Sequence, residues 1–217
     1  MILPAASCGV YIPERFNSQL SIYNHKDMFM QLGFYFDQSR CTGCYACVVA
    51  CSDWHDIQDS SVFRRRIIPR ESGSYPDLHL SYISLSCAHC SEPACAAACP
   101  AGAITKNGSD GRMVVDREQC LGLDMCGGMC REACPYDIPQ FGGEENPKMQ
   151  MCTFCPDRLE EGKQPVCVAA CPMRALDAGP LDELKEKYGD NVDAEGFIWS
   201  PETQPSFIIK PRYPSKK

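Results

Sequence analysis

The cysteines are the residues in this sequence whose type and spacing could do chemistry. The first quartet has the spacing C-x2-C-x2-C-x3-C and consists of Cys41, Cys44, Cys47 and Cys51. This spacing is typical of ligands to a [4Fe–4S] cluster, and the fourth cysteine of such a run usually binds the neighbouring cluster of a pair. The pattern therefore predicts one-electron transfer, without bond chemistry by the chain itself.

Two further quartets have regular spacing. The second reads C-x2-C-x4-C-x3-C-P, and the fourth reads C-x2-C, eleven intervening residues and C-x3-C-P. The ligands expected from these two quartets are Cys87, Cys90, Cys95, Cys99, Cys152, Cys155, Cys167 and Cys171. Disulfides and zinc are weaker interpretations. A reduced chain does not keep so many disulfides, and the tight first run suits one tetrahedral ion poorly.

The third quartet is irregular, and two assignments compete for it. Its cysteines are Cys120, Cys126, Cys130 and Cys134. In the first assignment all four are ligands, and Gly122, Gly127 and Gly128 absorb the extra residues. In the second, Leu123 stands where a ligand is expected, and Cys126 and Cys130 follow at regular spacing from Cys120. One iron site then stays open to a [3Fe–4S] cluster, and the role of Cys134 is left open. We favour the first, because the quartet ends in Cys-Pro and the total then reaches sixteen ligands.

Composition supports a metal-rich interior. The chain has 217 residues, enough for one large or two small domains, and 17 cysteines, of which Cys8 stands apart as an expected free thiol. The formal net charge of −7 argues against a nucleic-acid partner. Because the helix and strand signals are short and interrupted, we expect clusters to replace much of the apolar core and folding to depend on metal.

Short strands and helical turns must hold these cysteines in place. We expect a strand at residues 34–36 before the first quartet and another at 80–85 before the second. The alanines at 96–98 suit a helical turn against a cluster. A helix at 181–188 and a strand at 207–209 are expected outside the cluster core.

The sequence contains an internal repeat. FDQSRC before the first quartet parallels VDREQC before the third, and CPAGAI at the end of the second parallels CPMRAL at the end of the fourth. Residues 34–104 and 113–176 therefore look like two copies of a two-quartet ferredoxin unit.

Other features predict no separate activity. The four histidines are scattered and form no catalytic set, and His89 either tunes a cluster potential by hydrogen bonding or packs at the surface. The arginine run at 64–66 is expected to be solvated or to face a partner.

No apolar run approaches the ~18 residues of a membrane span. The first residues lack the basic region and apolar core of a secretory signal.

With these motifs, the chain resembles the four-cluster ferredoxin-type (beta) subunits of the dimethyl sulfoxide reductase family of molybdopterin enzymes. The resemblance covers roughly residues 33–212 and rests on FDQSRCTGCYACVVAC, SLSCAHCSEPACAAACPAGAI, VVDREQC through CPYDIPQF, and CTFCPDRLEEGKQPVCVAACPMRALDAGPLDEL. The third quartet departs from the family pattern. It is partly similar to the nitrate-reductase type, in which a tryptophan takes the ligand position occupied here by Leu123 and a [3Fe–4S] cluster results.

The resemblance implies a nested pairing of the quartets, one and four building two clusters and two and three the other two. The implied sets are Cys41, Cys44 and Cys47 with Cys171; Cys51 with Cys152, Cys155 and Cys167; Cys87, Cys90 and Cys95 with Cys134; and Cys99 with Cys120, Cys126 and Cys130. The implied fold is α+β, with two ferredoxin-like lobes at 33–84 plus 146–180 and at 85–145. Residues 1–32 would form an N-terminal extension, and 181–217 a C-terminal helix and strap.

The resemblance also implies the function. Single electrons would pass through four iron–sulfur clusters between a large catalytic subunit with a molybdenum or tungsten pterin and a quinone-linked membrane subunit or soluble redox partner. The chain would be non-catalytic by itself. Its expected location is the cytoplasm, in a membrane-associated complex, with export alongside a signal-bearing partner left open. The rival interpretations are a subunit of a hydrogenase or other pterin-free complex and a free polyferredoxin, because the same relay serves many enzymes.

Overall fold

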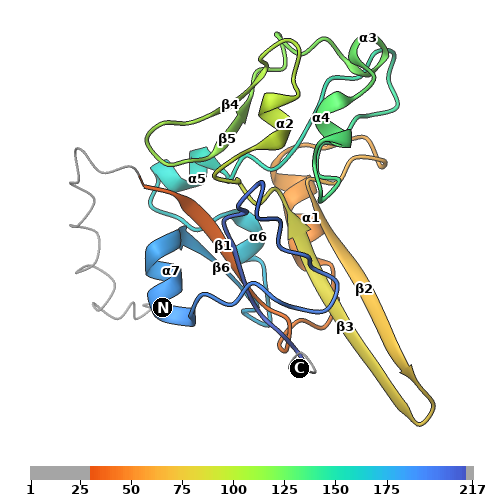
Figure 1. The fold of residues 1–217 in the computed structure, drawn as a ribbon, viewed down its shortest axis with the longest axis vertical. Coiled ribbons are helices and arrows are strands. Elements are labelled where there is room, and N and C mark those ends of the chain that lie inside the picture. The colour runs from red at the N-terminus through yellow and green to blue at the C-terminus, as the bar shows by residue number, and fades with distance from the viewer. Residues whose placement is uncertain (1–29, 214–217) are drawn as a thin grey trace, which may run out of the picture.

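The protein is described here by a computed structural model in which residues 30–213 are placed. Within these residues, three small β-sheets and seven short helices form a mixed architecture, and a long two-stranded hairpin projects from it (Figure 1). The α+β class is therefore confirmed. Cys8 and the rest of residues 1–29 lie outside the described part.

A three-stranded sheet forms the centre of the molecule. Its middle strand is β1 (Leu32–Asp37), which pairs antiparallel with β6 (Leu176–Pro180) and parallel with β7 (Phe207–Lys210). Every residue of β1 is buried, because the main apolar core covers one face and α7 (Leu181–Tyr188) covers the other. The strands expected at 34–36 and 207–209 and the helix expected at 181–188 are confirmed.

The cysteines of the first and fourth quartets lie on short helices beside this sheet. These helices are α1 (Ala46–Trp54), α5 (Pro156–Glu160) and α6 (Val166–Ala169). The helices α1 and α6 lie against each other, although more than a hundred residues separate them in the chain. The fold thus brings the first and fourth quartets together.

The second and third quartets occupy the opposite end of the molecule, drawn at the top of Figure 1. The elements there are α2 (Ala94–Ala97), β4 (Ile104–Lys106), β5 (Met113–Val115), α3 (Leu123–Cys126) and α4 (Met129–Glu132). The helical turn expected near the alanines is α2. No helix among residues 30–213 is long and apolar enough to cross a bilayer.

The internal repeat corresponds to one strand pair that occurs twice. Phe36 of β1 pairs with Leu176 of β6, and the equivalent Val115 of β5 pairs with Ile104 of β4. Asp37 ends β1 and donates its N–H to the Ala175 carbonyl before β6 at 2.7 Å. The equivalent Asp116 follows β5 and donates to the Ala103 carbonyl before β4 at 2.8 Å. Each strand pair therefore joins the segment that precedes one quartet to the segment that follows another.

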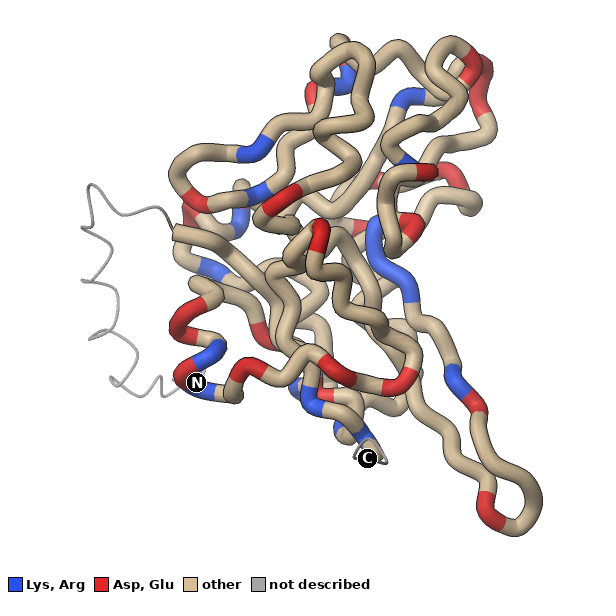
Figure 2. The backbone as a smooth tube through the Cα atoms, viewed as in Figure 1, with Lys and Arg blue, Asp and Glu red and all other residues tan. Residues whose placement is uncertain are grey.

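The hairpin consists of β2 (Arg65–Ser74) and β3 (Asp77–Ser86), paired in register from Arg65 opposite Ser86 to Ser74 opposite Asp77. Its base is buried and its outer half is exposed. The strand expected at 80–85 lies within β3. The arginine run lies at the base of the hairpin, where Figure 2 shows a continuous basic stretch. The expectation of a solvated or partner-facing run is wrong for Arg65, which is 1% exposed, because strand residues alternate between two faces.

Candidate iron–sulfur sites

Three pockets are each lined by four cysteines, and each set comes from two separate quartets. Site A is lined by Cys41, Cys44, Cys47 and Cys171. Site C is lined by Cys87, Cys90, Cys95 and Cys134. Site D is lined by Cys99, Cys120, Cys126 and Cys130. Their empty volumes, which include some open solvent, are about 310, 300 and 350 Å³ respectively.

A fourth set, site B, consists of Cys51, Cys152, Cys155 and Cys167, and all four residues are buried. Burial raises the pKa of the Cys51 thiol, and the charges of the other three cysteines raise it further. The four thiols therefore lie close enough to interact. The structure thus brings together each of the four cysteine sets implied by the resemblance; that these sets hold iron stays a prediction.

Backbone N–H groups are directed at the cysteine sulfurs. His89 donates its N–H to Cys87 Sγ at 3.4 Å, Phe154 donates to Cys152 Sγ at 3.4 Å, and Ala175 donates to Cys171 Sγ at 3.3 Å. His89 and Phe154 both have a positive φ, of 46° and 66°, which lets the chain turn tightly between the two cysteines of a C-x2-C pair. Such donors stabilise negative charge on sulfur and influence the potential of an iron–sulfur cluster.

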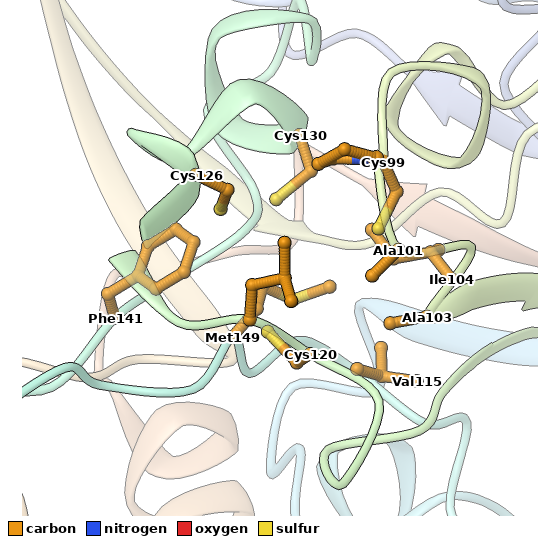
Figure 3. A pocket seen from close by; sticks show the side chains of 12 residues that line it. Cys99, Ala101, Ala103, Ile104, Val115, Cys120, Cys126, Cys130, Phe141 and Met149 are labelled. Carbon is orange, nitrogen blue, oxygen red and sulfur yellow. The ribbon is translucent and has the colours of Figure 1, made fainter. Parts of the chain in front are cut away.

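Glycines shape the irregular third quartet, as predicted. Gly122 precedes α3, and Gly127 and Gly128 connect α3 to α4; their φ angles are 91°, 65° and 73°. This connection places Cys126 and Cys130 on two consecutive helical turns beside the same pocket (Figure 3).

The lining of site D bears on the two competing assignments. Four cysteines surround the pocket, together with apolar side chains that include Phe141 and Met149. Leu123 is not among the lining residues, and Cys134 lies at site C. This arrangement favours the assignment in which all four cysteines of the third quartet are ligands.

Burial raises the pKa of several of the cysteine thiols. Burial, with contributions from neighbouring thiolates, raises the pKa of both Cys95 and Cys155 to about 12. Metal binding must therefore displace protons, as is usual for thiolate ligands. Among residues 30–213, no group of three or more His, Cys, Asp or Glu side chains is arranged to hold a single metal ion. Three of the cysteine sets instead line pockets, and thiolate donors fit iron–sulfur clusters.

A buried cation lies between sites A and B. Burial tends to lower the pKa of Arg65, but the surrounding Cys167, Cys47, Cys152 and Cys51 thiolates outweigh burial and hold the pKa above its ordinary value. A buried guanidinium requires nearby negative charge, which thiolate-bound clusters would supply. Sequence reasoning missed this residue, and the start of an alternating strand at the arginine run was the signal that could have revealed it.

His89 is buried and does not pack at the surface, so that alternative is wrong. Its Nδ1 accepts the N–H of Met113 at 2.9 Å, and burial lowers its pKa to about 3, so the ring is neutral. The ring lies edge-on to Phe154 of site B, with centroids 5.2 Å apart. His89 therefore ties site C both to β5 and to site B.

The four sites follow one another in the order A, B, C, D. After burial, the pKa of Cys47 at site A is raised in part by Cys167 at site B. The pKa of Cys87 at site C is likewise raised in part by the charge of Cys152 at site B. The pKa of Cys95 at site C is raised in part by the charge of Cys130 at site D. Cysteines of adjacent sites therefore lie close enough to interact electrostatically.

Protein-family models match two parts of the chain. A "4Fe-4S dicluster domain" matches residues 78–181, and a "4Fe-4S binding domain" matches residues 32–53. The B subunit of the anaerobic dimethyl sulfoxide reductase of Escherichia coli (strain K12) is 41% identical over 197 residues, which cover 87% of this chain and 93% of that protein. The chain belongs to the family of dimethyl sulfoxide reductase B subunits.

Other relatives in this family serve different reductases and dehydrogenases. The formate dehydrogenase-O iron-sulfur subunit of Escherichia coli (strain K12) is 31% identical over 77% of this chain and 59% of its own length. The thiosulfate reductase electron transfer subunit PhsB of Salmonella typhi is 37% identical over 68% of this chain and 74% of its own length. The chain is therefore a non-catalytic iron–sulfur electron-transfer subunit that binds [4Fe–4S] clusters.

Proposed function

We propose that the chain relays single electrons through four [4Fe–4S] clusters held at sites A to D. The observation that carries this proposal is the convergence of sixteen cysteines, taken from four quartets, into four sets of four. When bound, the clusters supply one-electron redox chemistry. The chain's own part is to hold them in a row, exclude water and fix the local charge.

We further propose that sites A and D are the two ends of the relay. One end would face a catalytic subunit with a molybdenum or tungsten pterin, and the other a quinone-linked membrane subunit or soluble partner. The names of the relatives support a catalytic partner, since they are subunits of dimethyl sulfoxide reductase, formate dehydrogenase and thiosulfate reductase. A membrane-associated complex on the cytoplasmic side is the corresponding location.

The domain organisation is part of the same proposal. Two ferredoxin-like lobes would be formed by residues 33–84 plus 146–180, around sites A and B, and by residues 85–145, around sites C and D. The repeated pairing of β1 with β6 and of β5 with β4 supports this division. Residues 1–32 and 181–217 would be additions to the two lobes.

The experiment is anaerobic purification with iron and metal analysis. About sixteen irons per chain are expected, four per cluster; about fifteen would indicate a [3Fe–4S] centre, and eight or fewer would contradict the four-cluster proposal. A co-purifying subunit with molybdenum or tungsten is expected, whereas nickel would contradict the pterin partner.

Two serine variants test the ligand sets. Cys126→Ser should perturb the cluster at site D, and Cys134→Ser should perturb the one at site C, each leaving the other three signals intact in electron paramagnetic resonance (EPR) spectra. Leu123→Ala is the matched control and should keep all four signals. Loss of the same cluster in both serine variants would contradict the assignment.

A further inference from the structure

Arg65 is a buried cation at the base of the hairpin. Its Nη1 donates to Ser84 Oγ at 2.9 Å, its Nη2 donates to Ser86 Oγ at 2.8 Å, and its Cζ lies 4.8 Å from the centroid of the Phe34 ring. None of the ion pairs within residues 30–213 includes Arg65. Since a buried charge without a counter-charge is strongly unfavourable, its partner must be another kind of negative group.

The negative groups around Arg65 are cysteines of two sites. The Ser84 hydroxyl accepts from Arg65, which leaves its proton free to donate to Cys47 Sγ of site A, 3.6 Å away. On the site B side, the guanidinium interacts electrostatically with Cys167, Cys152 and Cys51. One fixed positive charge thus faces both sites.

We propose that Arg65 is a positioning residue for electron transfer that raises the reduction potentials of the clusters at sites A and B, with the larger effect at site B. This inference rests on the proposed function. Adding one electron makes a site more negative by one charge and neither makes nor breaks a bond. The Arg65 charge stays the same, so its attraction is greater after reduction than before.

Two features of the geometry set the size and ranking of the effect. Arg65 is 1% exposed, so water and salt screen its charge weakly. Three site B cysteines interact with it directly, against one at site A, which it reaches partly through Ser84. Site B should therefore respond more strongly than site A, and sites C and D should respond least.

The adjacent arginine provides a matched control. Arg66 points to the opposite face of β2, where it bonds to Asp137 Oδ2 at 3.1 Å and to the backbone carbonyls of Tyr136 and Asp137. It is partly exposed and does not contact the cysteines of sites A and B. Arg66→Gln therefore removes the same charge one residue away, from a partly exposed position where solvent screens it and Asp137 already pairs with it.

The experiment is an EPR-monitored redox titration of the anaerobically purified complex, with iron content as a check on assembly. Arg65→Gln should lower the reduction equilibrium constant at site B at least tenfold, which for a one-electron couple is about 59 mV. A smaller decrease is expected at site A. Arg65→Lys, which keeps the charge, and Arg66→Gln should both give wild-type potentials.

Each result has a definite meaning. Unchanged potentials in an Arg65→Gln protein with all four clusters would overturn the inference while leaving the proposed relay intact. A tenfold change in Arg65→Lys with all clusters present would also overturn it, because the charge is kept. If Arg65→Gln loses clusters, the Arg65→Lys variant decides: wild-type potentials in that variant support the inference. Loss of clusters in both variants would mean that Arg65 has a structural role and would overturn the inference. Absence of clusters from the wild-type protein would contradict the proposed function itself.

Discussion

His89 lies edge-on against Phe154, with ring centroids 5.2 Å apart and ring planes at 74°. Each residue directly precedes the second cysteine of a C-x2-C pair, one at site C and the other at site B. Phe154 also contacts Phe34 of the central sheet, at a centroid separation of 4.4 Å. Aromatic rings, two of which belong to the main apolar core, thus fill the boundary between sites B and C.

This packing predicts a large effect of truncating Phe154. The side chain is 0% exposed, so Phe154→Ala would leave a cavity between the two sites and should destabilise the protein by about 3–5 kcal/mol. Denaturant unfolding of the cluster-loaded protein measures this loss. Phe154→Leu keeps most of the volume and should cost clearly less. Equal stability of the Ala variant and the wild type would show that the rings do not support the boundary.

Removal of the clusters should unfold the chain. Sixteen cysteines surround the four sites, and many of the residues in the main core cluster are cysteines or contact them. Without clusters, buried thiols would face voids in sheets of only two or three strands, which are marginal alone. We expect anaerobic chelation to abolish protection of backbone amides in β1 from hydrogen exchange. Retained protection there would mean that apolar packing suffices for folding.

The central sheet predicts a pH effect on the alkaline side. Tyr35 is 6% exposed and stacks on Tyr188 of α7 with centroids 3.7 Å apart. Burial, followed by the charge of Asp37, raises the pKa of Tyr35 from 10 to about 12. Between these values the unfolded state has lost this proton and the folded state keeps it. The contribution to stability is therefore complete below pH 10 and is lost as pH rises toward 12.

The test compares the wild type with Tyr35→Phe in denaturant unfolding at pH 9 and pH 11. The wild type should lose about 1 kcal/mol more than the variant over this range, because phenylalanine has no proton to lose. Tyr188 is present in both proteins, and its charge contributes to the raised pKa of Tyr35 in the wild type only. Parallel pH profiles for the two proteins would mean that the Tyr35 hydroxyl is accessible to hydroxide in the folded state.

The sequence predicted the local parts of this fold well. Cysteine spacing is a local property of the chain, so the quartets could be identified directly. Local sequence also predicted the short strands at 34–36 and 207–209 and the helix at 181–188. The repeat also indicated the equivalence of the two strand pairs, since Val115 and Phe36 occupy the same place before their quartets.

The remaining features depend on the tertiary environment. Arg65 has the same side chain as Arg64 and Arg66, and only the pairing of β2 with β3 decides which of the three is buried. The neutral state of His89 likewise depends on its burial in the folded chain, where its Nδ1 accepts the N–H of Met113, 24 residues away. Neither long-range contact is encoded in local spacing.

The irregular third quartet gives the last prediction. Gly127 and Gly128 both have φ in the left-handed region, where a side chain costs about 1 kcal/mol. A Cβ at Gly127 would meet nothing within 4 Å, whereas one at Gly128 would lie 3.0 Å from Leu123 Cδ1. Gly127→Ala should therefore lower stability by about 1 kcal/mol. Gly128→Ala should lower it further and should also reduce iron at site D, because α4 carries Cys130.

The control is Gly179→Ala in β6, where φ is ordinary and a Cβ would meet nothing within 4 Å. Its stability and iron content should match the wild type. EPR spectra of the three variants then separate backbone strain from damage to the site. If Gly128→Ala kept the site D signal and lost no more stability than Gly127→Ala, Leu123 would have moved aside. Contact between the glycine turn and Leu123 would then play no part in placing Cys130.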